Sequence, residues 1–265
     1  MKFYIADVKR VKINGLDLWQ FENFLAYKTI KHFVTDRKSY PSEDGFTLSL
    51  SSLPDRSQVL HNRSLVADAM EIDHADLYFP SQVHKTRILH VTRNTDREHL
   101  LDTDALVSNE PGICIAVMSA DCVPILLYDK KNSAVAAVHA GWRGTVAKIL
   151  EKTLHEMNRL FGTTGEDLHA GIGPSVSIEA YEVGEEVAHE VIRNFEYHEQ
   201  LLVPLYEKKF KLDLWNANKH QLIDFGVSPA NIEISELCTV NHNHHFFSAR
   251  KGDKGRFAAG IMLSH

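Results

Sequence analysis

The fold of this chain is constrained most by a run of strand-like segments that is followed by one amphipathic helix. Between residues 76 and 138, short stretches rich in Val, Ile and Leu follow one another, a pattern typical of strands. Residues 144–161 then carry apolar side chains on one helical face, and Gly162 is well placed to end that helix. The pattern predicts an α/β (α+β) fold, a mixed β-sheet sandwich flanked by helices.

Other segments extend this prediction along the chain. Helices are predicted over residues 56–70 and 185–195, and a strand leading into a helix over 211–225. A turn and a strand are predicted within 44–50, and further strands at 168–172, 232–235, 246–250 and 256–263. Because no repeat, low-complexity tract or linker interrupts the chain, residues 1–265 are predicted to form a single domain.

Composition narrows the functional classes. A net charge of −6 gives no broad basic surface for nucleic acid. Three cysteines without paired spacing indicate a reducing compartment and no disulfide scaffold. The first residues lack a secretory apolar core, and no apolar run approaches the ~20 residues of a membrane helix. We expect a cytoplasmic protein that binds neither nucleic acid nor membrane; the sequence leaves its oligomeric state open.

Three ligand-type side chains stand at predicted strand ends. His139 closes the apolar part of Ala-Val-His-Ala-Gly-Trp-Arg-Gly (residues 137–144), whose glycines are expected to take backbone angles that other residues avoid. His84 follows an apolar stretch in the same way, and Cys122 stands between two apolar runs. Neutral imidazole and thiolate suit Zn²⁺, and three protein ligands leave it an open position. Spacing alone leaves open whether the three residues meet or are ordinary buried or surface side chains.

Several motifs occur in an order that carries a resemblance. They are Gln82-Val83-His84, Ala120-Asp121-Cys122, the string from His139 to Gly144, Gly173-Pro174-Ser175, Tyr181-Glu182-Val183-Gly184, and a tail from Phe247-Ser248 to Gly255-Arg256-Phe257. Over about residues 45–265 the chain resembles the multicopper-polyphenol-oxidase-like family, the laccase-domain proteins regarded as purine nucleoside phosphorylases. The resemblance implies an α/β sandwich similar to a bacterial toxin domain that deamidates with a Cys and a His.

The resemblance also implies a function. It predicts phosphorolysis of adenosine, inosine and methylthioadenosine to free base and a ribose 1-phosphate, with adenosine deamination as a second activity. Its partners would be purine nucleosides and phosphate, and Zn²⁺ would be held by His84, Cys122 and His139.

Further roles are assigned to residues around these ligands. Asp121 could orient a ligand or move a proton, and Gln82 could contact ribose or support a ligand. Phosphate or ribose contacts are predicted for Asn62, Arg63, Arg143 and Arg250, with Arg256 as a further candidate for phosphate. Guanidinium groups suit this task because they bind phosphate in a bidentate geometry. Each of these residues could instead be structural.

Three alternative hypotheses about the function remain open. A copper-dependent polyphenol oxidase (laccase) would exploit the tight binding of copper to His and Cys, but it needs many histidines in paired motifs, and such pairs occur only in residues 241–245. A Cys-His hydrolase or deamidase would use Cys122 as nucleophile and His139 as base without a metal. A non-catalytic partner in cell-wall precursor editing would need neither chemistry.

Overall fold

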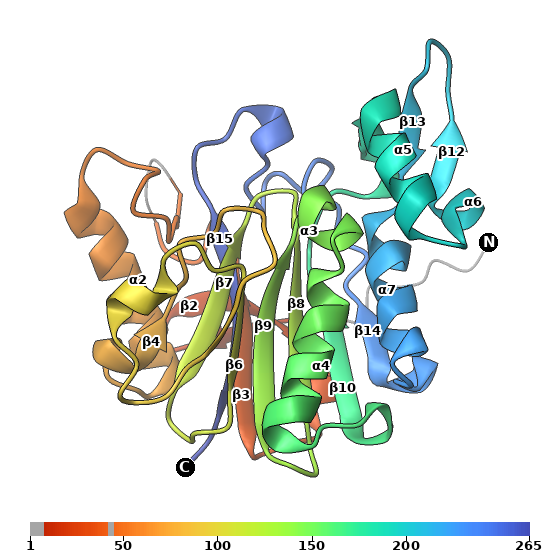
Figure 1. The fold of residues 1–265 in the computed structure, drawn as a ribbon. Coiled ribbons are helices and arrows are strands. Elements are labelled where there is room, and N and C mark those ends of the chain that lie inside the picture. Colours follow the sequence, from red (N-terminus) through yellow and green to blue (C-terminus); the bar gives the residue numbers. More distant parts are fainter. Residues whose placement is uncertain (1–7, 42–44) are drawn as a thin grey trace.

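The computed structural model describes residues 8–41 and 45–265, in which two six-stranded sheets pack face to face (Figure 1). The first sheet has the order β1-β2-β3-β15-β7-β4 and is antiparallel except for the β4–β7 pair. Its strands are β1 (Val8–Ile13), β2 (Leu16–Phe21), β3 (Ile30–Thr35), β4 (Leu77–Tyr78), β7 (Cys114–Ser119) and β15 (Phe257–Leu263).

The second sheet has the order β14-β10-β8-β9-β6-β5. Both of its outermost pairs, β10–β14 and β5–β6, are parallel, and the central pairs are antiparallel. Its strands are β5 (Ile88–His90), β6 (Ala105–Ser108), β8 (Val123–Asp129), β9 (Ala134–Ala140), β10 (Leu168–Ile172) and β14 (Ile232–Ile234). A smaller sheet joins β11 (Glu182–Val183), β12 (Leu202–Pro204) and β13 (Phe210–Leu212).

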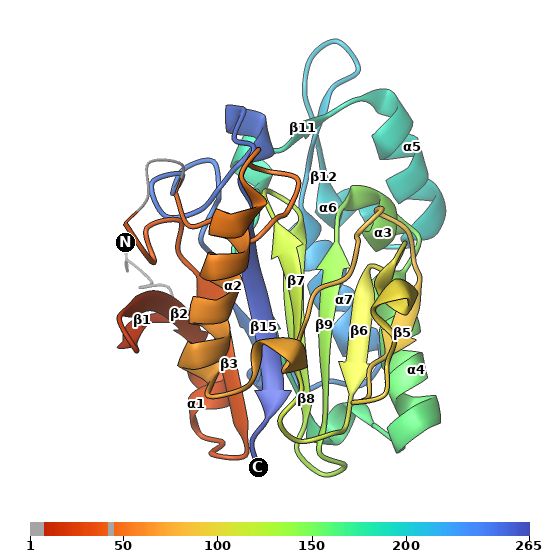
Figure 2. The same ribbon diagram turned by 90° about the vertical axis from the view of Figure 1, so that its left-hand side faces the viewer.

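Helices cover the outer faces of both large sheets (Figures 1 and 2). The helix α2 (Arg56–Met70) lies on the first sheet, and α3 (Trp142–Val146), α4 (Ile149–Phe161) and α7 (Leu214–Asp224) lie on the second. The remaining helices are α1 (Glu22–Leu25), α5 (Glu185–Asn194) and α6 (His198–Leu201). The predicted mixed sandwich flanked by helices is therefore confirmed; its similarity to a toxin deamidase stays a prediction.

The alternation of side chains along the strands explains this layering. In β8, Leu126 packs into the core between the sheets, whereas Ile125 and Leu127 pack on the helix side with α4. In β7, Ile115 likewise faces the inter-sheet core, and Ala116 faces α2. Because successive residues of a strand point to opposite faces, a strand buried on both faces is apolar throughout. This is why the stretch from 113 to 138 reads as nearly continuous apolar sequence.

Several predicted elements are confirmed. The helix predicted at 56–70 has the same bounds, and Asp55 caps it by accepting a hydrogen bond from the Ser57 amide. Gly162 ends α4 in the left-handed conformation, with φ of 75°. The strands at 168–172, 232–235 and 256–263 and the helix at 185–195 are present to within one residue at either end.

Three predictions about local structure are wrong. The helix predicted at 144–161 is two helices, because Lys148 takes a left-handed φ of 62° and its ammonium packs 3.7 Å from the centre of the Phe195 ring. Residues 246–248 form a bend and an irregular stretch that leads into a short 3-10 helix (Ala249–Lys251), and the Ser248 amide donates to the Asp253 carboxylate. Residues 45–50 form no strand: the Phe46 and Leu48 amides donate to two different segments, at Arg37 and Arg256, and the Thr47 and Ser49 amides bond within residues 45–50. The predicted Asp44 lies outside the described residues.

The chain crosses between the two large sheets at one end of the sandwich. The turn 120–122 leads from the end of β7, in the first sheet, to the start of β8, in the second. The loop between β4 and β5 makes the same crossing, and β9 ends beside the start of β8, where Val123 pairs with Ala140. These three segments carry the candidate site. Among the described residues, no helix is long and apolar enough to cross a membrane.

Candidate metal centre and active site

His139 is the most firmly held of the three ligand-type residues. It is buried, one residue before the end of β9, a strand in which every residue is buried. Its backbone amide donates to the carbonyl of Asp104, and its Nδ1 lies 2.9 Å from the Asp104 carboxylate. Because an ionised carboxylate only accepts hydrogen bonds, Nδ1 must donate, and the Nε2 atom of the ring is left to bind a metal ion.

Cys122 lies in the tight turn between β7 and β8. The residue before it, Asp121, has a φ of 87°, and the Ser119 hydroxyl donates to the Cys122 carbonyl. A Cβ atom at Gly141 would lie 2.8 Å from the Cys122 sulfur and 3.1 Å from His84 Cδ2. Gly141 has an ordinary extended backbone, and Gly144 lies within α3. The prediction that these glycines serve unusual backbone angles is therefore wrong. Glycine is needed at position 141 because a side chain there would collide with Cys122 and His84.

His84 completes a convergent group. Its ring stands edge-on to the His139 ring, with centroids 4.9 Å apart, and its backbone has a φ of 60°. The ligand atoms of His84, Cys122 and His139 all lie within 4.8 Å of one another. His84 is exposed, Cys122 half-buried and His139 buried, so the group is closed on one side and open on the other. Two nitrogens and one sulfur in this arrangement suit a zinc ion with an open position.

Electrostatics within this group favour a thiolate. Burial opposes ionisation of Cys122, but His139 and then His84 outweigh it and lower the pKa of the thiol to about 6. Burial likewise opposes protonation of His139, but Cys122 and Asp104 raise its pKa to about 9. Both shifts favour the thiolate, the form in which cysteine binds a metal ion.

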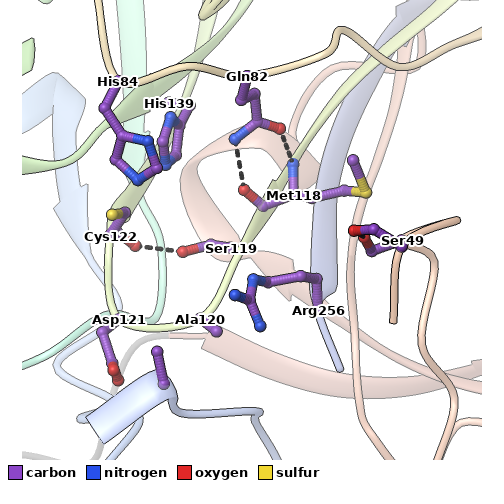
Figure 3. Close-up of a pocket in the computed structure, with 12 residues that line it drawn as sticks. Ser49, Gln82, His84, Met118, Ser119, Ala120, Asp121, Cys122, His139 and Arg256 are labelled. Atoms are coloured by element: carbon purple, nitrogen blue, oxygen red, sulfur yellow. Dashed lines mark hydrogen bonds between the residues drawn. The ribbon is translucent and has the colours of Figure 1, made fainter. Parts of the chain in front are cut away.

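A cavity of about 410 Å³ opens beside the three ligands (Figure 3). It is lined by Ser49, Ser51, Gln82, His84, Met118, Ser119, Ala120, Asp121, Cys122, His139, Ala249 and Arg256. In Figure 3 the two histidines and Cys122 lie on one side of the cavity, and Ser49 and Arg256 lie on the other. Its size is in the range of small-molecule sites in proteins.

Among the described residues that line this cavity, Arg256 is the one arginine. Its Nη1 donates to the carbonyls of Lys254, at 3.0 Å, and Gly255, at 2.8 Å. Nε and Nη2 make no hydrogen bond within the described part of the chain, so they can donate to an anion in the cavity.

The other predicted arginines lie elsewhere. Arg63 donates from Nε to the Leu48 carbonyl and stacks on Phe79, behind the cavity wall. Arg143 is exposed and stacks on Trp142, in a separate hollow. Arg250 stacks on Tyr181, and its Nη2 donates to the Glu182 carbonyl.

The polar side chains predicted to act at the site form hydrogen bonds that hold neighbouring segments together. Asp121 accepts hydrogen bonds from the Thr239 hydroxyl and the Arg250 amide, which ties the turn before Cys122 to the C-terminal segments. Gln82 donates to the carbonyl of Met118 and accepts from its amide. Asn62, on α2, donates to a carbonyl of the opposite segment, that of Thr47.

Sequence reasoning missed Asp104, Met118, Ser49 and Ser51. Asp104 had a weak signal, since it is an acidic residue placed directly before the buried strand β6. The two serines and Met118 carried none, because they reach the cavity only through the folding of irregular segments and a strand end.

Comparisons with known proteins identify the family of this chain. The family model described as "Multi-copper polyphenol oxidoreductase laccase" matches residues 31–264. A purine nucleoside phosphorylase from Bacteroides thetaiotaomicron is 40% identical over 257 residues, covering 92% of this chain and 95% of that protein. The adenosine deaminase RL5, from an unknown prokaryotic organism, is 34% identical over 250 residues, covering 91% and 94%.

A solved structure extends the match to three dimensions. The hypothetical protein YfiH from Bacillus licheniformis has a TM-score of 0.89 at 26% sequence identity, covering 98% of this chain and 100% of that one. The fold, the site and these relatives place the chain in a single class: it belongs to the family of multi-copper polyphenol oxidoreductase laccase-like proteins.

Proposed function

We propose that this protein is a zinc-dependent purine nucleoside phosphorylase. It cleaves adenosine, inosine and methylthioadenosine with phosphate to the free base and ribose 1-phosphate or its methylthio derivative. The observation that carries the proposal is one cavity that holds both a group of three metal-ligand residues and the guanidinium of Arg256. Two relatives named purine nucleoside phosphorylase, at 40% and 33% identity, support the substrate class.

The donor set supports zinc in this proposal. His84, Cys122 and His139 supply two imidazole nitrogens and one thiolate, the ligands that Zn²⁺ prefers. A bound zinc ion supplies Lewis acidity to an oxygen of phosphate or substrate. Asp104 keeps the His139 ring turned with Nε2 toward Cys122, and Gly141 leaves room for the sulfur and the His84 ring.

The opposite side of the cavity supports the phosphorolytic step. Arg256 would hold phosphate through Nε and Nη2, close to the serines at 49 and 51, which can donate or accept hydrogen bonds from sugar hydroxyls. A phosphate oxygen then forms a bond to the ribose C1′ as the bond from C1′ to the purine N9 breaks. The bonding pair leaves with the purine, which takes up a proton.

Adenosine deamination is proposed as a second activity of the same cavity. Water would replace the exocyclic amine at the purine C6, releasing ammonia and giving inosine. The relative named adenosine deaminase RL5 supports this assignment.

A copper-dependent polyphenol oxidase is less well supported, despite the family description. Oxidases with several coppers need several ligand clusters. In residues 8–41 and 45–265, one group of three or more His, Cys, Asp or Glu residues has convergent ligand atoms.

A second candidate rests on a specific observation. Cys122, with its lowered pKa, His139 and Asp104 form the order nucleophile, base and orienting carboxylate of a cysteine hydrolase. This enzyme would form a thioester with an amide or ester substrate and would need no metal. Activity that survives complete metal removal would favour it.

One experiment tests the main proposal. Zinc-loaded and chelator-treated protein are each incubated with adenosine, with and without phosphate, and the products are identified by mass. We expect adenine and ribose 1-phosphate only with both zinc and phosphate, and inosine with zinc alone. If zinc-loaded protein yields none of these products, the enzymatic proposal is wrong and the non-catalytic partner gains support.

A further inference from the structure

Asp104 joins two of the three candidate ligands through one buried carboxylate. It lies immediately before β6, and its side chain is fully buried. One oxygen, Oδ1, lies 2.9 Å from His139 Nδ1 and also accepts the amide of His84 at 2.9 Å. The other, Oδ2, accepts the amides of Lys85 at 2.8 Å and Val83 at 3.3 Å. The carboxylate is thus satisfied by four donors from two segments.

The contact with His139 fixes the chemistry of that ring. Since an ionised carboxylate can only accept, Nδ1 carries the proton and Nε2 is the free ligand atom. A buried acceptor on the far ring nitrogen holds the ring orientation and makes Nε2 a better donor to a metal.

The contact with the loop of His84 addresses backbone strain. His84 has a φ of 60°, a conformation that non-glycine residues adopt at a cost of about 1 kcal/mol or more. Three successive amides, from 83 to 85, point at the Asp104 carboxylate and hold this conformation. This arrangement aims the His84 ring at His139 and Cys122.

From this geometry we infer that Asp104 is the positioning residue of the metal centre. It sets the tautomer of His139 and the backbone conformation of His84 at the same time. The carboxylate thereby holds the loop that carries His84 in place against β9, which carries His139. The inference rests on the proposed metal site but not on the reaction performed there. Loss of the carboxylate should lower zinc affinity by about tenfold to about a hundredfold, the usual effect of removing a partner of a ligand.

The chain offers a matched control for this test. Asp129, at the other end of β8, is also fully buried, and its carboxylate accepts the amides of Lys131 and Asn132. It contacts none of the ligands within the described structure. Asp129→Asn should therefore cost stability as Asp104→Asn does, but leave zinc affinity unchanged.

The experiment compares full-length wild type, Asp104→Asn, Asp104→Ser and Asp129→Asn by chelator competition for zinc and by the absorption spectrum of the Co²⁺-loaded protein. We expect weaker zinc binding and altered Co²⁺ bands in both Asp104 variants only. Metal-free wild type should also show a hydrogen-bonded Nδ1 proton of His139 by NMR, which Asp104→Ser should lose. If Asp104→Asn does not fold, Asp104→Ser and this resonance carry the test.

The outcomes separate this inference from the proposed function. Wild-type zinc affinity and spectrum in a folded Asp104 variant overturn the inference, as does an equal loss in Asp129→Asn. A wild type that binds no zinc overturns the inference and the metal site together. If the Asp104 variants lose zinc but wild type cleaves no nucleoside, the inference stands and the proposed reaction fails.

Discussion

The two sides of the cavity are built in different ways. The metal wall, made of His84, Cys122 and His139, sits at strand ends and sheet crossings and is held by buried carboxylates. The opposite wall, made of Ser49, Ser51 and Arg256, sits on irregular segments. The first takes its geometry from the sheets, and the second depends on contacts between distant segments.

Those contacts on the opposite wall are few and specific. The Leu48 amide donates to the Arg256 carbonyl, and the Arg256 amide donates to the Thr47 hydroxyl. From outside, Asn62 and Arg63 donate to the carbonyls of Thr47 and Leu48. We therefore expect substitutions of the metal-ligand residues to lower zinc binding and the rate of cleavage. Substitutions around the opposite wall should change either the affinity for phosphate or the local stability.

The largest effect is expected from the metal wall. Cys122→Ser or His139→Ala should lose bound zinc and lower nucleoside cleavage at least about a thousandfold, since a metal's contribution of about 4 kcal/mol corresponds to that factor. Elemental analysis and product assays measure both. Cys114→Ala is the control: this buried thiol in β7 contacts no ligand, so zinc and activity should remain. Full zinc in the Cys122 variant would contradict the assignment.

The second effect contrasts His139, which has a carboxylate partner, with the buried imidazole of His32, which has none among the described residues. Burial lowers the pKa of His32 to about 3, and its Nε2 accepts the Phe21 amide. Because the folded pKa lies below the unfolded value, this stabilisation is complete above pH 6.5 and is lost as the pH falls toward 3. At 1.36 kcal/mol per pKa unit, the loss is about 3 kcal/mol between pH 7 and pH 4 and approaches about 5 kcal/mol near pH 3.

Urea unfolding of wild type and His32→Gln between pH 7 and pH 4 measures this effect. The glutamine keeps an acceptor for the Phe21 amide but does not titrate, so its stability should fall less steeply with acid. Equal slopes for the two proteins would show that His32 is not the group responsible.

The third effect isolates phosphate binding on the opposite wall. Arg256→Gln should raise the KM for phosphate about tenfold to about a hundredfold, since hydrogen bonds to charged groups contribute about 1.5–3 kcal/mol. Zinc content should stay unchanged. Arg143→Gln is the matched control, because Arg143 is exposed and stacks on Trp142 outside the cavity. If Arg143→Gln raises the phosphate KM and Arg256→Gln does not, the anion lies in the other hollow.

The smallest effect concerns how the opposite wall is held. Asn62→Ala leaves the Thr47 carbonyl without its donor and should cost about 1–3 kcal/mol of stability, with a moderate rise in both substrate KM values. Asn158→Ala removes a similar hydrogen bond, to the Thr163 carbonyl, far along α4. It should lower the Tm without changing either KM; a matching KM rise in both variants would refute a local role for Asn62.

The same contrast explains what the sequence could predict. The metal wall was recognisable because apolar runs mark strands, and a His or Cys at a strand end is placed by the sheet. The layered fold followed for the same reason. The resemblance to a known family then supplied the nucleoside substrates, which no spacing of residues encodes.

The opposite wall was predictable only in part: the sequence offered Arg256 as a further candidate for phosphate, but not the two serines. The contacts that build this wall join residues about 200 positions apart through single hydrogen bonds, which no local pattern reports. Arg63 has the sequence context of an anion ligand, yet the fold turns it toward the Leu48 carbonyl and gives the cavity Arg256 instead. The aromatic residues Phe246 and Phe247 favour a strand in the sequence, but they are buried in an irregular segment after a turn. Lys148 breaks a periodic helix by a backbone angle that side-chain patterns do not report.

The proposed reaction requires that phosphate held in this cavity attacks the nucleoside. The most direct measurement incubates zinc-loaded wild type with adenosine and phosphate labelled with ¹⁸O at all four oxygens, followed by mass analysis of the sugar product. We expect ribose 1-phosphate that carries all four labelled oxygens, in an amount equal to the adenine released. Release of adenine with free ribose, or the absence of any labelled sugar phosphate, would contradict it.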